Sequence, residues 1–148
     1  MAHPHPHPHP SSAARGVLLA VASLAVFAVT LAPRQLAGPV RTLVMDLAHV
    51  FAAPLVEPMT FIEVESTLNA LLFVPLGAAV ALALSRRLWM LAPVLVFCAS
   101  FAIESVQAAI PGRVPDVQDI VWNTIGGIIG AVAVGIVRGL WALGRRRS

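Results

Sequence analysis

Charged side chains are scarce in this chain, and their scarcity excludes the usual classes of soluble protein. Only 11% of the 148 residues are charged and 58% are hydrophobic, whereas a soluble domain carries about 25% charged residues. The mean hydropathy of +0.85 points the same way. The composition therefore predicts an integral membrane protein.

Lysine and tyrosine are absent, and cysteine occurs once. The ten basic residues are all arginine. They lie mostly at the ends of apolar runs, which is typical of topology signals, and we therefore predict no nucleic-acid partner. A single cysteine excludes an internal disulfide and a cysteine metal cluster. We expect Cys98 to be a small buried hydrophobic residue.

Residues 1–14 begin with four His-Pro pairs. Proline at alternate positions is incompatible with a helix or a sheet ladder, so this tail is predicted to be disordered. Its histidines are candidate metal ligands, but a low-complexity tail without a metal is the favoured interpretation. These histidines are His3, His5, His7 and His9.

Four apolar runs are long enough to cross a hydrocarbon core of ~30 Å. They cover residues 16–32, 68–84, 88–109 and 120–140. A cleaved signal peptide is an alternative for the first run, but an uncleaved span is favoured because no convincing cleavage site precedes a soluble domain. The sequence therefore predicts an all-α bundle of four transmembrane helices. Its parts are a first helix at 15–33, a three-helix core at 68–140 and a basic tail at 141–148.

The connection at 34–67 contains one further helical pattern. Its apolar residues recur at helical spacing with polar residues between them, which predicts a short amphipathic helix that lies on the membrane surface or caps the bundle. Pro54 and Pro58 are expected to end this helix. Asp46 and His49 are a candidate ligand pair, but a solvated helix face is the favoured interpretation. The apolar residues of the pattern are Val40, Leu43, Val44, Leu47, Val50 and Phe51.

The arginines predict which way the bundle faces. With four spans, both termini and the connection at 85–87 share one side of the membrane. That side holds seven arginines, against three on the other side. The positive-inside rule then places both termini in the cytoplasm.

Polar residues concentrate in the stretch at 100–123. Ser100, Glu104 and Gln107 share one helical face, and a second polar row follows on the next helix. The Pro111-Gly112 turn is short, so the two helices are expected to be antiparallel neighbours whose polar rows meet. We predict an outward-facing polar pocket formed by Glu104, Gln107, Arg113, Asp116, Asp119 and Asn123.

Glu104 is expected to lie at hydrocarbon depth, where an unpaired charge costs ~2.5–3.5 kcal/mol on insertion scales. It therefore needs a partner such as Arg113, or a neutral protonated form. The structural alternative to a binding site is a Glu104–Arg113 pair, with Gln107 and Asn123 joining helices by hydrogen bonds. For Asp116, an N-cap of the next helix is weighed equally against a binding role.

Small residues predict where the helices pack closely. The Gly126-x-x-x-Gly130 pair continues the face of Asn123 and admits a neighbouring backbone. A similar stripe follows the second apolar run, where a proline is tolerated because neighbouring helices satisfy the freed carbonyl. The residues predicted to pack are Asn69, Pro75, Gly77, Gly126, Gly127 and Gly130.

Three sequence blocks in this order resemble the VanZ-like family. They begin at Asn69 (NALLFVPLG), Ser100 (SFAIESVQ) and Arg113 (RVPDVQDIVWNTIG), and they span residues 69 to about 130. The resemblance implies a small multi-spanning bacterial membrane protein, so the bacterial cytoplasmic membrane is the expected location. The namesake of the family is associated with low-level resistance to the glycopeptide teicoplanin.

Three functions are open. The favoured one is a non-enzymatic cell-envelope protein that contacts membrane lipids and binds a lipid headgroup, a wall precursor or a glycopeptide in the polar pocket. The second is a membrane hydrolase or transferase in which Asp116 and Asp119 hold a divalent ion and Glu104 is the acid or base. The third is a proton or ion pathway through Glu104. The sequence contains no nucleophile elbow, phosphate loop or His-Glu zinc motif, and we predict no cofactor and no resident metal.

Overall fold

The computed structural model describes residues 12–31, 34–109 and 116–145. Most of the predicted His-Pro tail, the Pro111-Gly112 turn and Arg113 lie outside this part of the chain. The described elements are all helical. They are α1 (Ser12–Thr30), α2 (Arg34–Val56), α3 (Phe61–Ala83), the 3-10 helix η1 (Trp89–Leu91), α4 (Ala92–Ala108) and α5 (Val117–Gly144).

Four helical segments in these ranges are long and apolar enough to cross a membrane. The prediction of an all-α membrane bundle with four spans is therefore confirmed. Helices satisfy their own backbone hydrogen bonds, which is why an apolar chain can cross lipid in this form. The segments are Ser12–Thr30, Ile62–Ala83, Trp89–Ala108 and Val117–Gly144.

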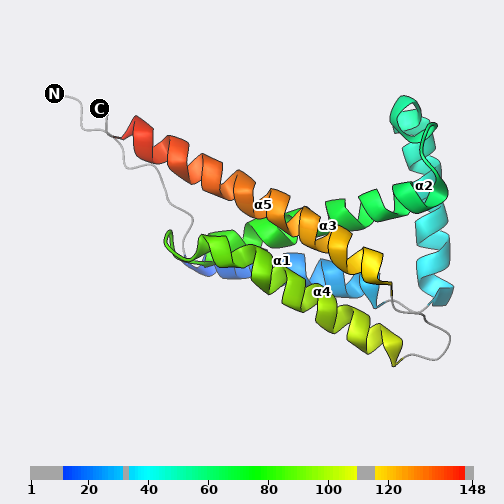
Figure 1. Ribbon diagram of the computed structural model, residues 1–148, viewed down its shortest axis with the longest axis horizontal. Helices are drawn as coiled ribbons and strands as arrows, with labels where there is room; N and C mark the ends of the chain where they lie inside the picture. Colours follow the sequence, from blue (N-terminus) through cyan, green and yellow to red (C-terminus); the bar gives the residue numbers. More distant parts are fainter. Residues whose placement is uncertain (1–11, 32–33, 110–115, 146–148) are drawn as a thin grey trace.

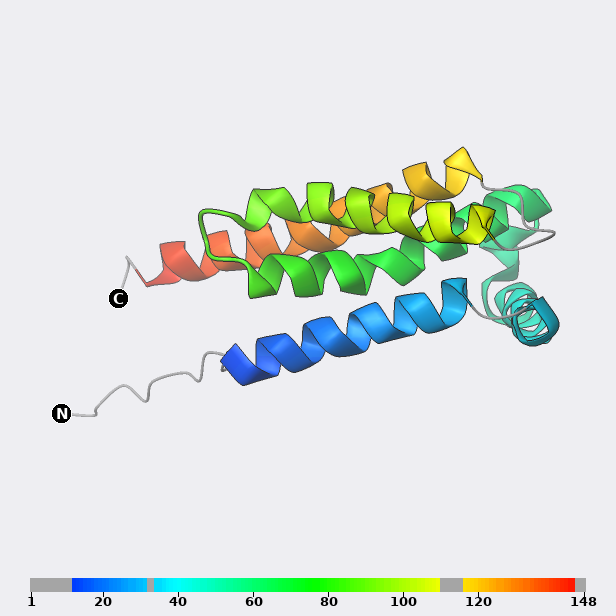
Figure 2. The ribbon, with the colours of Figure 1, turned by 90° about the horizontal axis from the view of Figure 1, so that it is seen from below.

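The spans alternate in direction, so the start of α1 and the end of α5 lie at the same end of the bundle as the α3–α4 connection (Figure 1 and Figure 2). α3 is central because it packs against α1, α4 and α5, and α4 also packs against α5. α2 runs across the opposite end (Figure 1). We call that opposite end the polar end (residues 27–31, 61–69, 100–109 and 116–123) and the other the arginine end (residues 12–16, 81–91 and 135–145).

The closest packing in the bundle joins α3 to α5. A Cβ atom added to Gly126 would overlap the carbonyl oxygen of Ala70, and one added to Gly77 would overlap the backbone of Gly127. Only glycine lets the two backbones approach so closely, and such approach is how membrane helices gain van der Waals contact without a hydrophobic driving force. Gly130 makes the same kind of contact with the backbone carbonyl of Val74.

The main apolar core lies where α1, α3 and α4 meet. It consists of Val26, Phe73, Leu76, Val96 and Ile103. α1 contributes one buried side chain, Val26, and its other side chains are half-buried or exposed. In a bilayer, lipid tails cover such exposed apolar surface at no cost to the helix.

Cys98 is exposed on α4, so the prediction that it is buried is wrong. The apolar run around it faces lipid on one side and the core on the other. Hydropathy does not distinguish these two faces, because lipid tails are as apolar as a protein core.

α2 is longer than the predicted amphipathic helix, and it is kinked at Ala52, whose φ and ψ are −132° and 26°. Pro54 follows the kink instead of ending the helix. It falls in the first turn of the second helical piece, where the missing N–H would have no helical partner. Leu47 and Val50 are exposed on α2, as expected for a helix that lies against a membrane surface. The end of α2 packs onto α3 through Val56.

α3 begins at Phe61, before the apolar run at 68–84. A capping box starts the helix: the backbone N–H of Thr60 donates to the Glu63 carboxylate (2.7 Å), and the Glu63 N–H donates to Thr60 Oγ1 (3.4 Å). Two donors that a helix start leaves without helical partners are thereby satisfied. Glu63 and Glu65 therefore belong to the first turns of α3 and not to an irregular connection.

Candidate functional site

The polar side chains inside the spans gather at the polar end of the bundle. They come from the last turns of α4, the first turns of α5 and the outer part of α3, close to the end of α1. Glu104 and Asn123 are 5% and 3% exposed, so both are inside the protein, and both lie within segments long and apolar enough to cross a membrane. Burial of that kind requires polar partners.

Asn123 and Ser100 join α5 to α4. The Asn123 Nδ2 atom donates to Ser100 Oγ at 2.9 Å, and both side chains are buried. Asn123 Oδ1 is also buried, and it accepts no hydrogen bond within the part of the chain that the structure describes. Asn123 Oδ1 can therefore accept a further hydrogen bond between α4 and α5.

Glu104 faces the beginning of α5, one turn beyond Ser100 on the same helix. Its Oε2 atom accepts a hydrogen bond from the backbone N–H of Asp116 at 3.1 Å. Asp116 itself is exposed and caps α5, because its Oδ1 atom accepts from the Gln118 N–H at 2.8 Å. Of the two roles weighed for Asp116, the structure therefore places it as the N-cap.

Asp119 lies at the interface of α5 with α3. The Nδ2 atom of Asn69 donates to Asp119 Oδ1 at 2.7 Å, and this contact is half-buried. Asn69 was predicted as a helix-packing residue and Asp119 as a pocket residue, and the structure bonds the two together. The stripe of small residues that contains Asn69 and Gly77 had indicated that this face of α3 packs against another helix.

Gln107 is directed toward α1 and not toward α5. Its Nε2 atom donates to the backbone carbonyl of Thr30 at 2.6 Å. Thr30 is the last residue of α1, and a helix end leaves such carbonyls without helical partners. A backbone acceptor carries no signal in the sequence, so this contact was not predicted.

The predicted pocket residues therefore share one end of the bundle but divide among three helix interfaces. Ser100, Glu104 and Asn123 belong to the α4–α5 interface. Asp119 belongs to α3–α5, and Gln107 belongs to α4–α1. Arg113, the predicted partner of Glu104, lies outside the described residues.

An apolar cavity of about 110 Å³ lies between α1, α3 and α4. Ile103 lines it, whereas Glu104, the next residue of α4, is directed toward the start of α5. Gln107 and Thr30 join α4 to α1 one turn further out. Its lining residues are Ser23, Val26, Phe27, Leu76, Val80, Leu95, Val96, Ala99 and Ile103.

The carboxylates do not form an evident metal centre. In residues 12–31, 34–109 and 116–145, no group of three or more His, Cys, Asp or Glu side chains could hold a metal ion. Asp116 and Asp119 bond to different partners. Asp46 and His49 are both exposed on α2.

Arg138 is a structural residue that the sequence analysis counted as a topology signal. It belongs to α5, and its guanidinium donates to the carbonyls of Ala81, Leu82 and Leu84 at the end of α3 (2.9, 3.1 and 3.4 Å). A charge near the end of an apolar run is costly unless it is paired. The cost of an unpaired charge at this position was therefore the sequence feature that could have indicated a bonding partner for Arg138.

The comparisons with known proteins give one match. A family model described as VanZ/LLP1 matches residues 16–138. No curated protein and no solved structure matches the chain. The matched region contains α2 and the three sequence blocks that begin at Asn69, and it includes most of every span.

Proposed function

The chain belongs to the VanZ/LLP1 family, and on that premise we propose that it binds the headgroup of an amphiphilic molecule at the polar end of its bundle. The protein is a multi-pass membrane protein. We place it in the bacterial cytoplasmic membrane, with the polar end facing outward. The candidate ligands are a membrane lipid, a lipid-linked wall precursor and a glycopeptide antibiotic.

One observation carries this proposal: Glu104 and Asn123 are buried inside the bundle, and Asn123 Oδ1 has no donor among the described residues. A buried polar atom without a partner costs about 1–3 kcal/mol. A hydroxyl or amide donor of a bound headgroup removes this cost. Binding of such a headgroup would recover the free energy lost by leaving Asn123 Oδ1 unpaired. This favours a binding site over a purely structural role for Asn123.

The adjoining cavity supports an amphiphile and not a fully polar ligand. The cavity is apolar and lies between α1, α3 and α4, one turn deeper than the Gln107–Thr30 bond that joins α4 to α1. An acyl or prenyl chain gains contact there, while its headgroup stays with the polar side chains. Small-molecule sites typically combine an apolar lining with a few polar groups in this way.

The charge distribution supports headgroups that donate hydrogen bonds. All seven carboxylates of the chain lie between residues 46 and 119, in α2, at the polar end or in the turn between α2 and α3. Carboxylates accept hydrogen bonds and attract ammonium groups. Two alternatives stay predictions: a metal-dependent hydrolase or transferase, and a proton pathway through Glu104. No observation in the described residues supports either of them specifically.

The test is a binding measurement on purified protein in phosphatidylcholine nanodiscs, with and without Mg²⁺. The probes are phosphatidylethanolamine, a polyprenyl-linked wall precursor and teicoplanin. Gln107→Ala and Asp119→Asn are expected to weaken binding of the recognised probe by more than tenfold, since a charge-assisted hydrogen bond contributes about 1.5–3 kcal/mol. Both variants are expected to fold, because a hydrogen bond between membrane helices averages only ~0.6 kcal/mol.

Thr124→Val is the matched control. Thr124 lies next to Asn123, but its hydroxyl donates to the carbonyl of Ile120 in its own helix (2.7 Å). Its removal should leave binding unchanged. If Gln107→Ala and Asp119→Asn retain full affinity, or if no probe binds the unaltered protein, the polar cluster is structural and the proposal is rejected.

A further inference from the structure

The apolar cavity between α1, α3 and α4 opens toward the lipid around the bundle. Phe27 of α1 and Leu95 of α4 both line it, and they are also 45% and 47% exposed on the outside of the protein. Leu76 and Val96 line the same cavity and are buried. Because buried residues form one part of the lining and lipid-facing residues the other, the cavity is closed toward the core and open between α1 and α4.

α1 leaves this gap because it packs loosely. It lies at the edge of the bundle, beside α3 (Figure 2), and Val26 is the one side chain of Ser12–Thr30 that is buried. The Gln107 amide holds the end of α1 to α4 one turn further out, at 2.6 Å from the Thr30 carbonyl oxygen. Deeper than that bond, Ser23 and Ala99 are the smallest side chains of the lining, so they leave space between the two helices unfilled.

The shape and the chemistry of the cavity suit a hydrocarbon chain. Its lining on α4 runs from Leu95 to Ile103, about 12 Å along the helix, so the volume of about 110 Å³ extends along the helices. A cavity with apolar walls stays dry, and its walls lack partner atoms for dispersion contacts. A chain from the bilayer supplies those contacts without crossing water, because lipid already covers Phe27 and Leu95.

We propose that one acyl chain of a bilayer phospholipid enters this cavity sideways, between Phe27 and Leu95. The inference deepens the proposed function and rests on it for the headgroup, because it selects a membrane lipid among the candidate ligands. An unbranched chain fits a narrow cavity better than a prenyl chain, which carries a methyl branch on every isoprene unit. The lipid-facing surface of α1 and α4 is continuous with the cavity, so the lipid reaches it without leaving the membrane.

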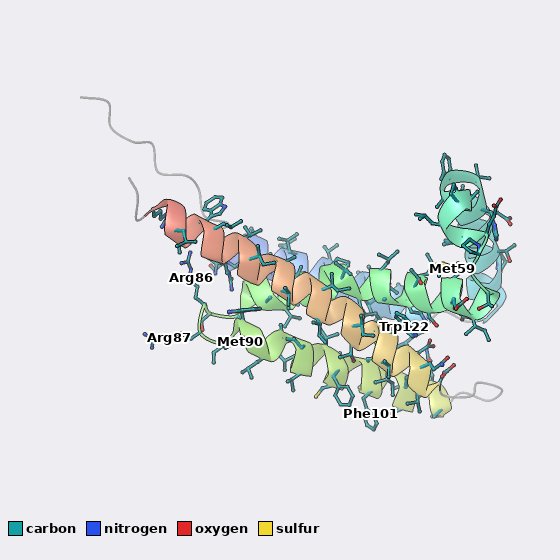
Figure 3. The ribbon with its side chains drawn as sticks, turned by 45° about the horizontal axis from the view of Figure 1, so that its top comes forward. Met59, Arg86, Arg87, Met90, Phe101 and Trp122 are labelled. Atoms are coloured by element: carbon teal, nitrogen blue, oxygen red, sulfur yellow. The ribbon has the colours of Figure 1, made fainter. Side chains whose placement is uncertain are left out.

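The experiment maps where a photoreactive acyl chain touches the protein. The full chain is reconstituted in phosphatidylcholine vesicles that contain a phosphatidylethanolamine with a diazirine in one acyl chain, and mass spectrometry locates the label after illumination. Label is expected on Leu76 and Val96, which lipid at the outer surface cannot reach. Phe101 points outward from α4 (Figure 3), so its label reports ordinary lipid contact and serves as the reference.

Ala99→Leu and Ser23→Leu fill the cavity from α4 and from α1. Both variants should lose the label on the two buried residues and keep the label on Phe101. Ala133→Leu is the matched control, because Ala133 is exposed on α5, and it should change neither label. Label on Leu76 that survives both fillings overturns the site, as does label confined to Phe101 in the unaltered protein.

Two further results decide the type of chain and the relation to the polar end. An excess of polyprenyl phosphate should not reduce the label on the buried residues. If it does, the cavity takes a prenyl chain and the assignment to a phospholipid is wrong. If the buried residues are labelled while Gln107→Ala and Asp119→Asn retain full affinity for every probe, the chain site stands and the proposed headgroup site fails.

Discussion

The polar residues inside the spans link three pairs of helices: α4 with α5, α3 with α5, and α4 with α1. Asn69 bonds to Asp119 between α3 and α5, and Gln107 bonds to Thr30 between α4 and α1. Hydrogen bonds of this kind average ~0.6 kcal/mol in membrane proteins, with a maximum near ~1.7 kcal/mol. No single bond therefore decides whether the bundle forms.

The Asn69–Asp119 bond allows a direct test at this scale. In a double-mutant cycle of Asn69→Ala and Asp119→Ala, we expect a coupling energy of about 0.6–1.7 kcal/mol, because each single change already removes the shared bond. The free energy of unfolding in mixed micelles measures it. Pairing Asn69→Ala with Thr124→Val should give additive losses, since those side chains do not bond to each other. Additive losses for Asn69 and Asp119 as well would contradict the contact.

At the scale of elements, the glycines of α3 and α5 decide how the bundle packs. Gly77, Gly126 and Gly130 each meet backbone atoms of the other helix. Ala70 and Val74 offer those carbonyls from the same stripe of α3. The bond between Asn69 and Asp119 depends on this approach, because α5 must lie close to α3 before these short side chains can reach each other.

Gly126→Ala should therefore destabilise the protein, whereas Gly139→Ala should not. A methyl group at Gly126 overlaps the Ala70 carbonyl, and Gly139 has open space around it on the same helix. Overpacking of this kind costs about 1–3 kcal/mol, while alanine at an open helical position is neutral or favourable. Unfolding of the two variants in detergent gives the comparison. Equal stability of the two would mean that α3 and α5 do not approach as described.

At the scale of the whole molecule, charge is separated along the bundle. The carboxylates lie in α2, at the polar end or in the turn that follows α2, and most arginines lie at the arginine end or in the basic tail. The described ends of α1 and α5 share the arginine end (Figure 2). This separation predicts an orientation in the membrane.

Labelling of single cysteines tests the orientation. In a Cys98→Ala protein, we expect Gln118→Cys to react with an impermeant thiol reagent in intact cells. Ser85→Cys should react only after the membrane is opened, because the positive-inside rule retains the arginine-rich connection in the cytoplasm. Cys98 has to be replaced first, since it is exposed. The reverse labelling pattern would turn the polar end toward the cytoplasm and remove the outward site.

The number of spans and the segregation of charge were determined by the sequence alone, for a local reason. Hydropathy summed over about 20 residues measures the transfer of one helix into lipid, and it needs no knowledge of the neighbours. The helical spacing of Ser100, Glu104 and Gln107 likewise placed them on one face, because the helix has a fixed period. The small residues of α5 indicated a close packing face for the same reason.

Partners across helices were decided only by the tertiary structure. Gln107 lies on the same face as Glu104, yet it bonds to a backbone carbonyl at the end of α1. Arg138 bonds to three carbonyls that no side-chain pattern reveals, and Cys98 faces outward from a run as apolar as the core. These outcomes depend on how each helix is rotated about its axis. Packing sets that rotation, since lipid and protein interior are equally apolar and hydropathy cannot choose between them.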